Sequence, residues 1–255
     1  TAPLALHELV GPGFVMDDLC FTPDGTRLVH RAGPSFASQE LFSVPADGSA
    51  PPVQLSGAMG AGGTALADHA LTASGTRVVY RADEGEDERI ELWSAPVDGA
   101  AARLRLHAPL ASTRDVLEFK VAPLGERVVF RGDLDADEVV ELYSVLASDS
   151  SPVRLNPALI PGGDVVHCAI SPDGRTVAYV ADQLVDNRFE LFRVPIDGSA
   201  PALRLNGNLI SGGDVATVHN TYELLFSPDS ARVLYVADAL ANERFELFSV
   251  LTTGG

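Results

Sequence analysis

The chain reads Ile170-Ser171-Pro172-Asp173-Gly174, then Glu190-Leu191-Phe192, then Asp197-Gly198 and finally Leu203-Arg204-Leu205. Runs of alternating apolar residues lie between these landmarks. Alternating β-branched and aromatic residues, separated by Pro-Asp-Gly and Asp-Gly turns, predict short strands joined by tight hairpins. This stretch therefore predicts one sheet of four antiparallel strands.

The same pattern occurs five times along the 255 residues. The first turn recurs as Pro23-Asp24-Gly25, Ala73-Ser74-Gly75, Pro123-Leu124-Gly125, Pro172-Asp173-Gly174 and Pro228-Asp229-Ser230. The later triplet recurs as Glu40-Leu41-Phe42, Glu91-Leu92-Trp93, Glu141-Leu142-Tyr143, Glu190-Leu191-Phe192 and Glu246-Leu247-Phe248. A period of roughly 50 residues with four short strands is typical of a propeller blade. No segment has sustained helical periodicity, so the fold class predicted is all-β.

The two ends of the chain predict how a ring of blades closes. The last repeat lacks a fourth strand, whereas Thr1-Ala2-Pro3-Leu4-Ala5-Leu6 resembles the fourth strand at 199–205. We expect a single domain, 1–255: a five-bladed β-propeller of four antiparallel strands per blade, in which the N-terminal strand completes the last blade. Pairing the two ends removes exposed strand edges. A linear array and a fragment of a larger ring are the alternatives, and extra residues near 216–220 predict a longer loop.

The repeat units resemble a known family. Phe21-Thr22-Pro23-Asp24-Gly25, Ile170-Ser171-Pro172-Asp173-Gly174 and Phe226-Ser227-Pro228-Asp229 are similar to the repeat of TolB-type, WD-repeat-like bacterial propellers. The resemblance covers essentially the whole chain and implies the fold rather than the function. In that family such repeats occur in periplasmic interaction proteins, in regulatory propellers of prolyl-oligopeptidase-type enzymes and in secreted proteins. The resemblance therefore implies a periplasmic or secreted bacterial protein.

The net charge of the chain limits the classes of partner that it can bind. Lys and Arg number 18 and Asp and Glu 35, which gives a net charge of −17. So acidic a chain is not expected to bind nucleic acid, which requires a basic surface, or anionic lipid. No apolar run approaches the ~18–20 residues of a membrane span, so we expect no membrane insertion. The charge suits a cation or a basic protein partner, and we expect a monomer.

One position in every repeat collects polar side chains at the entry to the innermost strand. It holds Asp18, Asp68, Glu118, His167 and Glu223. Because this entry borders the channel of a propeller, we expect these five residues to line the channel and to bind a ligand there. Buried carboxylates need a partner, and a ring of them suits Ca²⁺, although no cofactor is otherwise expected. A hydrated channel lining and a catalytic site are the alternatives.

A second group of acids follows the second strand of four repeats, at Asp83, Asp133, Asp182 and Asp238. The copy that begins at Asp133 starts like a calcium loop, but Glu138 stands where an EF-hand needs glycine and Ser144 where it needs glutamate. An arginine precedes the repeated glutamate by two residues at Arg89, Arg188 and Arg244. Same-face spacing in a strand favours structural ion pairs or hairpin ends over a metal site.

Cysteines and histidines fit structural positions. Cys20 and Cys168 occupy neighbouring positions that face opposite ways in non-adjacent blades, so they cannot approach within the ~7 Å of a disulfide. We expect two free, buried thiols. His30 stands where other repeats have tyrosine or phenylalanine, and His69 stands in an apolar position. Both are expected to be buried rings.

Three functions are compatible with these features. A non-catalytic scaffold for protein or ligand binding around the channel is favoured, because the chain has no Gly-x-Ser-x-Gly elbow, P-loop or dinucleotide motif. A five-bladed glycosidase or lyase that uses channel carboxylates is the second hypothesis, although carbohydrate sites usually stack sugars on aromatic rings and the chain has one tryptophan, Trp93. A regulatory propeller domain of a larger peptidase is the third.

Overall fold

The computed structural model describes residues 3–8, 13–16, 18–60, 62–85, 88–216 and 223–254. Every regular element in these ranges is a β-strand. The all-β prediction is therefore confirmed for the described part of the chain. Within it, no helix is long and apolar enough to span a membrane.

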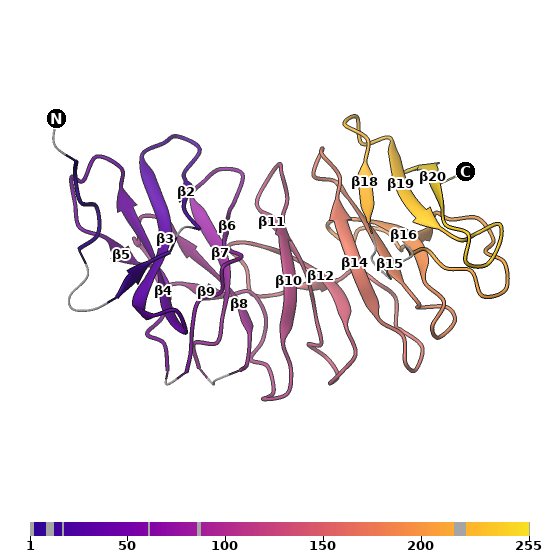
Figure 1. Ribbon diagram of the computed structural model, residues 1–255, viewed down its shortest axis with the longest axis horizontal. Coiled ribbons are helices and arrows are strands. Elements are labelled where there is room, and N and C mark those ends of the chain that lie inside the picture. The colour runs from indigo at the N-terminus through magenta and orange to yellow at the C-terminus, as the bar shows by residue number, and fades with distance from the viewer. Residues whose placement is uncertain are drawn as a thin grey trace. The chain divides into compact units, whose positions relative to one another are not determined.

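The strands form five antiparallel sheets in chain order, which we number as blades 1 to 5 (Figure 1). Blade 1 contains β1 (Phe14–Val15), β2 (Cys20–Phe21), β3 (Arg27–Ser35), β4 (Ser38–Pro45) and β5 (Val53–Gln54). Blade 2 contains β6 (Ala70–Leu71), β7 (Arg77–Ala82), β8 (Glu91–Pro96) and β9 (Leu104–Arg105). Blade 3 contains β10 (Val116–Val121), β11 (Arg127–Gly132), β12 (Glu141–Leu146) and β13 (Val153–Arg154). Blade 4 contains β14 (Val165–Ile170), β15 (Thr176–Ala181), β16 (Glu190–Pro195) and β17 (Leu203–Arg204). Blade 5 contains β18 (Leu224–Phe226), β19 (Arg232–Ala237) and β20 (Glu246–Leu251).

The chain divides into two compact units. Unit 1 comprises Thr1–Val116 and Leu146–Ser151, and unit 2 comprises Leu117–Val145 and Pro152–Gly255. Blades 1 and 2 lie in unit 1, and blades 3, 4 and 5 lie essentially in unit 2. The contacts below are given within each unit.

The Pro-Asp-Gly turns form the hairpins that the sequence predicts. In blade 4 the Ser171 hydroxyl donates to Asp173 Oδ1 at 2.5 Å, and the same oxygen accepts the Arg175 amide at 3.1 Å. Gly174 has a φ of 68°, the left-handed conformation that glycine adopts without strain. These bonds close the turn between β14 and β15 and fix their register, with Cys168 opposite Tyr179.

Neighbouring blades within each unit pack through apolar faces. Between blades 4 and 5, Leu191 and Val180 meet Tyr235 and Val233 in one buried cluster. Leu205, which follows the fourth strand of blade 4, belongs to the same cluster. Burial of these side chains stabilises the packing of blade 5 on blade 4.

The fourth strands of blades 1, 3 and 4 also contact the turn of the blade that follows each of them. Val53 lies against Gly99, Val153 against Gly198 and Leu203 against Gly254. Leu4 lies against Gly48 of blade 1 in the same way. The N-terminal segment therefore contacts blade 1 in the way that the fourth strand of a preceding blade would.

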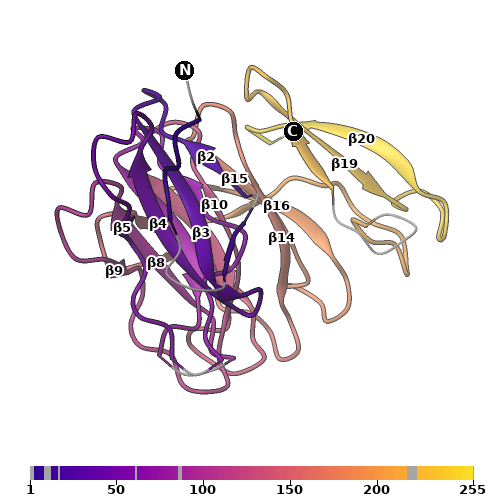
Figure 2. The same ribbon diagram turned by 60° about the vertical axis from the view of Figure 1, so that its left-hand side comes forward.

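The closed ring predicted from the chain ends is not seen. In the described residues blade 5 has three strands, β20 is its edge, and residues 3–8 form no strand (Figure 2). Leu247 on β20 is 70% exposed, whereas its counterpart Leu191 in blade 4 is 0% exposed. The longer loop expected near 216–220 lies, apart from Ala216, outside the described residues.

Candidate functional site

We call the repeat position of Asp18, Asp68, Glu118, His167 and Glu223 the channel slot. In unit 1, the acids of the channel slot are paired with arginines of the second strand. Arg31 forms an ion pair with Asp18, and Arg81 Nε lies 2.6 Å from Asp68 Oδ2. Arg31 Nη1 also donates to the Ala65 carbonyl at 2.8 Å, which lies before the first strand of blade 2. Arg81 Nη1 likewise donates to the Val116 carbonyl at 3.0 Å, so each arginine holds an acid of its own blade and a backbone carbonyl further along the chain.

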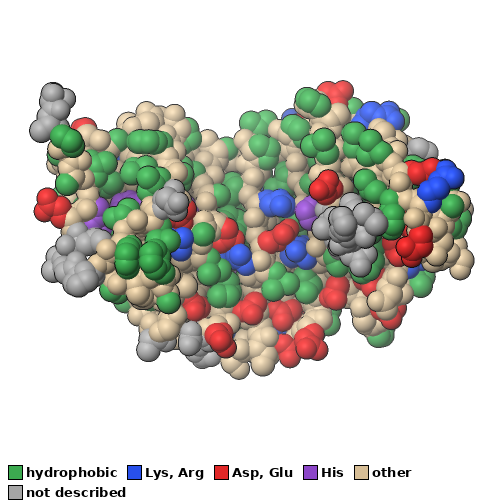
Figure 3. Space-filling model, viewed as in Figure 1, with side chains coloured by type: hydrophobic (Ala, Val, Ile, Leu, Met, Phe, Trp, Pro, Cys, Tyr) green, Lys and Arg blue, Asp and Glu red, His purple; other side chains and the backbone are tan. Residues whose placement is uncertain are grey.

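The same arrangement recurs in unit 2. Arg131 Nη2 lies 3.3 Å from Glu118 Oε2, and Arg131 Nη1 donates to the Val165 carbonyl of blade 4 at 2.8 Å. Burial alone would raise the pKa of Glu118, but the hydrogen bond and charge of Arg131, with Lys120, bring that pKa below its usual value. Acidic and basic side chains lie next to one another over β10 and β14 in Figure 3. Glu118 is therefore an ionised, structurally paired carboxylate at neutral pH.

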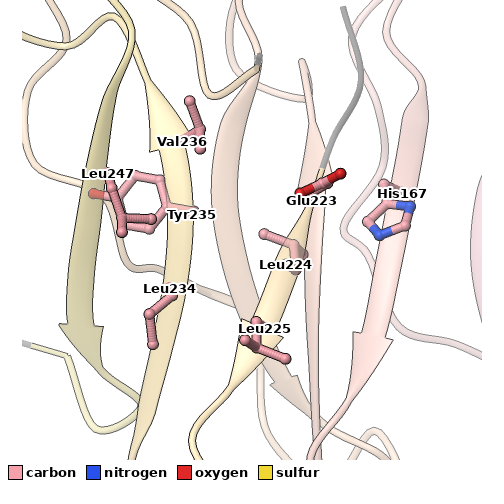
Figure 4. Close-up of a pocket in the computed structure, with 8 residues that line it drawn as sticks. All are labelled: His167, Glu223, Leu224, Leu225, Leu234, Tyr235, Val236 and Leu247. Atoms are coloured by element: carbon pink, nitrogen blue, oxygen red, sulfur yellow. The ribbon is translucent and has the colours of Figure 1, made fainter.

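The last two members of the slot lack this arginine. Its position is occupied by Val180 in blade 4 and Val236 in blade 5. His167 and Glu223 line a cavity of about 490 Å³ whose other lining residues come from β18, β19 and β20 (Figure 4). Those residues are Leu224, Leu225, Leu234, Tyr235, Val236 and Leu247. Burial lowers the pKa of His167, so the ring is neutral at pH 7.

The five slot residues fall into two groups. Asp18 and Asp68 lie in unit 1, and Glu118, His167 and Glu223 lie in unit 2. Their convergence on one channel stays a prediction. In the described ranges, no group of three His, Cys, Asp or Glu side chains is placed to hold a metal ion.

The arginine partners were missed by the sequence interpretation. The signal that reveals them is an arginine directly after the buried aromatic or histidine ring, in His30-Arg31, Tyr80-Arg81 and Phe130-Arg131. The repeat thus carries the acid and the arginine on adjacent strands, 13 residues apart in each of the three pairs.

The loop acids that follow the second strands bind backbone amides. Asp182 accepts the Asp164 amide at 2.6 Å and the Asn187 amide at 2.9 Å. Asp164 in turn accepts the Val140 amide of blade 3 at 2.7 Å. The expectation of a structural role is confirmed for these acids, which close loops and link blades.

The expected pairing of the repeated glutamates is only partly right. Arg244 binds Glu246 and Arg89 Nε lies 3.9 Å from Glu91 Oε1, but Arg188 donates to the Leu209 carbonyl. The glutamates of blades 2, 3 and 4 have their shortest ion pairs with fourth-strand arginines. These pairs are Glu91–Arg105 at 3.0 Å, Glu141–Arg154 at 2.8 Å and Glu190–Arg204 at 2.9 Å. The fourth strand lies beside the third, which brings the arginine closer than the residue two positions earlier.

Both cysteines are free, as expected, although only Cys168 is fully buried and Cys20 is half-buried. Burial, and then the negative charge of Asp18 and Glu118 respectively, raises the pKa of Cys20 to about 11 and that of Cys168 to about 12. We expect no reaction of Cys168 with a thiol reagent at pH 8 in the native protein, because the thiolate is the reactive form. Denaturation without reductant should expose two thiols in a colorimetric assay. A mass spectrum that shows the two cysteines linked would contradict the blade register.

His30 is buried, as expected, and is 2% exposed. Its Nε2 lies 2.7 Å from His7 Nδ1, and its ring stacks on Phe42. Burial, followed by the charges of His7 and His69, lowers the pKa of His30 to about 4, and Asp18 offsets this in part.

This lowered pKa predicts acid sensitivity. Above about pH 6.5, His30 is neutral in both the folded and unfolded states. As the pH falls from 6.5 towards 4, the unfolded chain binds the proton first, so stability decreases across that window. His30→Phe, which installs the ring found in blade 3, should flatten this part of the profile in urea unfolding at pH 7 and pH 4.5. An unchanged profile would exclude His30 as its source.

No family model and no curated protein matches the chain. Solved structures do match. The dipeptidyl peptidase 4 of Porphyromonas gingivalis has a TM-score of 0.61 at 13% identity, over 86% of this chain and 33% of that one. The oligogalacturonate lyase of Vibrio parahaemolyticus has a TM-score of 0.55 at 12% identity, over 92% and 61%. A TolB-type protein from Agrobacterium tumefaciens has a TM-score of 0.49 at 16% identity, over 92% and 82%.

These identities establish the fold alone. The chain spans about a third of the peptidase and less than two thirds of the lyase, so it corresponds to part of each of those proteins. With its antiparallel sheets, the chain has the β-propeller type of fold that its repeat sequence predicts.

Proposed function

We propose that the chain closes into a five-bladed ring and acts as a non-catalytic scaffold that binds a protein partner or ligand around its channel. Two observations support closure. Leu4 contacts blade 1 as the fourth strand of a preceding blade would. Blade 5 has no fourth strand beside β20 among the described residues. Residues 1–6 are the segment whose sequence fits that place. In such a ring the chain is a single domain and a monomer.

The arginine pairs carry the proposal of a non-catalytic role. Asp18, Asp68 and Glu118 are each bound to an arginine that also donates to a backbone carbonyl further along the chain. A general acid must hold its proton near neutral pH, whereas an arginine partner stabilises the charged carboxylate. These three acids therefore suit blade assembly better than proton transfer.

His167 and Glu223 are the slot residues left for a ligand. A neutral imidazole and a carboxylate beside an apolar wall suit a basic side chain flanked by apolar ones. The charge of −17 favours a basic partner in the same sense. The resemblance of the repeat units to those of TolB-type propellers favours a periplasmic or secreted location for this binding.

A selection of random dodecapeptides displayed on phage tests the proposal. Peptides enriched on the native protein should carry a basic residue beside apolar ones, and Glu223→Gln should abolish their binding. Asp68→Asn is the matched control, because it removes one slot charge but leaves His167 and Glu223 intact. Enrichment that survives Glu223→Gln would contradict the proposed site.

A polysaccharide lyase is the second candidate, favoured by the likeness to an oligogalacturonate lyase. Another matching structure is an oligogalacturonate lyase in complex with manganese, so Mn²⁺ belongs in the assay. Incubation with oligogalacturonate and Mn²⁺ should give no unsaturated product, which absorbs in the ultraviolet. A product that disappears in the Asp68→Asn and Glu118→Gln variants would replace the scaffold with the enzyme. The third candidate is the propeller domain of a larger peptidase. It rests on the match to dipeptidyl peptidase 4, of which this chain covers 33%.

A further inference from the structure

A buried ion pair distinguishes blade 2 from the other blades. The side chain of Glu84, which follows the second strand of this blade, is 3% exposed, and Arg103 Nε donates to its Oε2 atom at 2.5 Å. The repeat places Pro34, Leu134, Gln183 and Ala239 at the position of Glu84, and Pro52, Pro152 and Ala202 at the position of Arg103. No other blade has an acid at the first position, so the repeat folds without this pair.

The contacts of the pair fix the orientation of the Arg103 guanidinium. Glu84 Oε1 accepts the Gly57 amide at 2.7 Å and the Tyr80 hydroxyl at 2.9 Å, so the carboxylate is itself held in place. The guanidinium lies over the ring of Trp93, with Cζ 4.9 Å from the ring centroid. A planar cation bound at its Nε edge and stacked on an aromatic face has little freedom to turn.

Gly57 allows the pair to approach the backbone of blade 1. A Cβ atom at this position would lie 2.2 Å from Arg103 Nη2 and 2.6 Å from both Arg103 Cζ and Glu84 Oε2. These distances are far shorter than van der Waals contact, so a larger residue would have to displace the guanidinium. The position of Arg103 therefore depends on glycine at residue 57.

Arg103 lines a cavity of about 240 Å³ in unit 1. The cavity lies between the fourth strand of blade 1 and the third strand and following loop of blade 2, and its other lining residues include Gln54, Leu55 and Ser56. Ser56 Oγ accepts the Leu41 amide at 3.0 Å, which leaves its own proton for a further bond. The Nη1 and Nη2 atoms of Arg103 have no hydrogen-bond acceptor among the described residues. The cavity thus has an oriented cation and a hydroxyl donor in its wall.

The chemistry of this wall selects a small monoanion. The Nη1–Nη2 end of a guanidinium matches the two oxygens of a carboxylate in a bidentate pair. Glu84 already balances the charge of Arg103, so a dianion would bring two uncompensated charges beside a buried carboxylate, whereas a carboxylate brings one. The volume of about 240 Å³ equals that of about eight liquid water molecules and is smaller than the sites of drug-sized ligands.

We propose that this cavity, which we call the blade 2 cavity, binds a small carboxylate whose oxygens pair with Arg103 Nη1 and Nη2. The rest of the ligand lies toward Ser56 and Leu55. Glu84, Trp93 and Gly57 are positioning residues that hold the guanidinium in place for the ligand. The site uses none of the channel-slot residues, so its test is independent of the function proposed for the channel.

The fluorescence of Trp93 tests the inference, because Trp93 is the single tryptophan of the chain and its ring lies against Arg103. Titration of the full chain with sodium butyrate should change the emission in a saturable way. Butyramide, which is the neutral isostere, and sodium chloride at the same ionic strength should not. Saturation-transfer NMR on the butyrate methyl signal gives a second readout that does not depend on fluorescence. No saturable signal with butyrate in either measurement, equal binding of butyramide, or tighter binding of inorganic phosphate than of butyrate would overturn the inference.

Matched variants assign the binding to its residues. Arg103→Gln should weaken butyrate binding at least about tenfold, the usual value of one charge-assisted pair. Arg105→Gln is the control, because Arg105 also lies near Trp93 but is committed to Glu91. Binding that survives Arg103→Gln, or that Arg105→Gln weakens equally, would overturn the site.

A second pair of variants tests the positioning of Arg103. Gly57→Ala should weaken butyrate binding, because the added methyl group displaces the guanidinium. Gly207→Ala, at the corresponding position after the fourth strand of blade 4, meets no atom within 4 Å and should leave binding unchanged. Thermal unfolding of each variant separates loss of binding from loss of the fold. Equal butyrate affinity of the two folded glycine variants would overturn the geometry proposed for the site.

Discussion

Replacing Leu247 by alanine should lower the free energy of unfolding by as much as replacing Leu191, roughly 2–5 kcal/mol. The two leucines stand at the same position of β20 and β16, and Leu191 is fully buried between blades 4 and 5. A ring closed by residues 1–6 buries Leu247 in the same way. Loss of a buried leucine removes its transfer free energy and leaves a cavity.

Leu240→Ala is the control for this comparison, because Leu240 is 65% exposed on a loop of the same blade. It should change stability by less than about 0.5 kcal/mol. Urea unfolding of the three variants gives the comparison directly. If Leu247→Ala behaves like Leu240→Ala while Leu191→Ala is strongly destabilised, the chain in solution keeps an open edge and the closed ring is wrong.

The contrast between these leucines shows how far the sequence predicts the fold. The repeat, its Pro-Asp-Gly turns and the Glu-Leu-aromatic triplet are local signals, and a local signal repeated five times is hard to mistake. They predict the strands of each blade and the burial of His30. They also predict two unlinked cysteines, since strand alternation separates their side chains.

Contacts between blades were harder to predict. Arg131 acts on Glu118 of its own blade and on the Val165 carbonyl of the next, 34 residues along the chain. The sequence analysis therefore assigned Glu118 to a hydrated channel lining or a cation site, although its partner Arg131 stands at a repeated position of the sequence. Cys20 was expected to be as buried as Cys168, but β2 has only two residues and leaves it half-covered.

Replacing Arg131 by methionine should lower the free energy of unfolding by roughly 2–3 kcal/mol at pH 7. The change keeps much of the apolar stem but removes the guanidinium that neutralises Glu118 and holds the Val165 carbonyl. Glu118 then stays partly buried, with Lys120 at 3.9 Å as its remaining cation. Removing one partner of a pair costs more than removing both, because the charge that is left has lost its hydration.

The sign of the pH dependence distinguishes this explanation from simple loss of packing. In the native protein the pKa of Glu118 lies below its usual 4.5, so its contribution to stability is present above that pH and is lost as the pH falls. Without Arg131, burial dominates and raises the pKa of Glu118, so the folded variant binds a proton more tightly than the unfolded chain does. The deficit of Arg131→Met should therefore shrink between pH 7 and pH 4.

The double variant Arg131→Met/Glu118→Gln provides the control, because it leaves no carboxylate to protonate. It should recover part of the stability at pH 7, and its remaining deficit should not depend on the titration of residue 118. Thermal unfolding of native protein, single variant and double variant across this pH range measures both effects. A deficit that is equal at pH 7 and pH 4 in the single variant would show that Arg131 acts through packing and its bond to Val165, and that the channel-slot acids do not need their arginines.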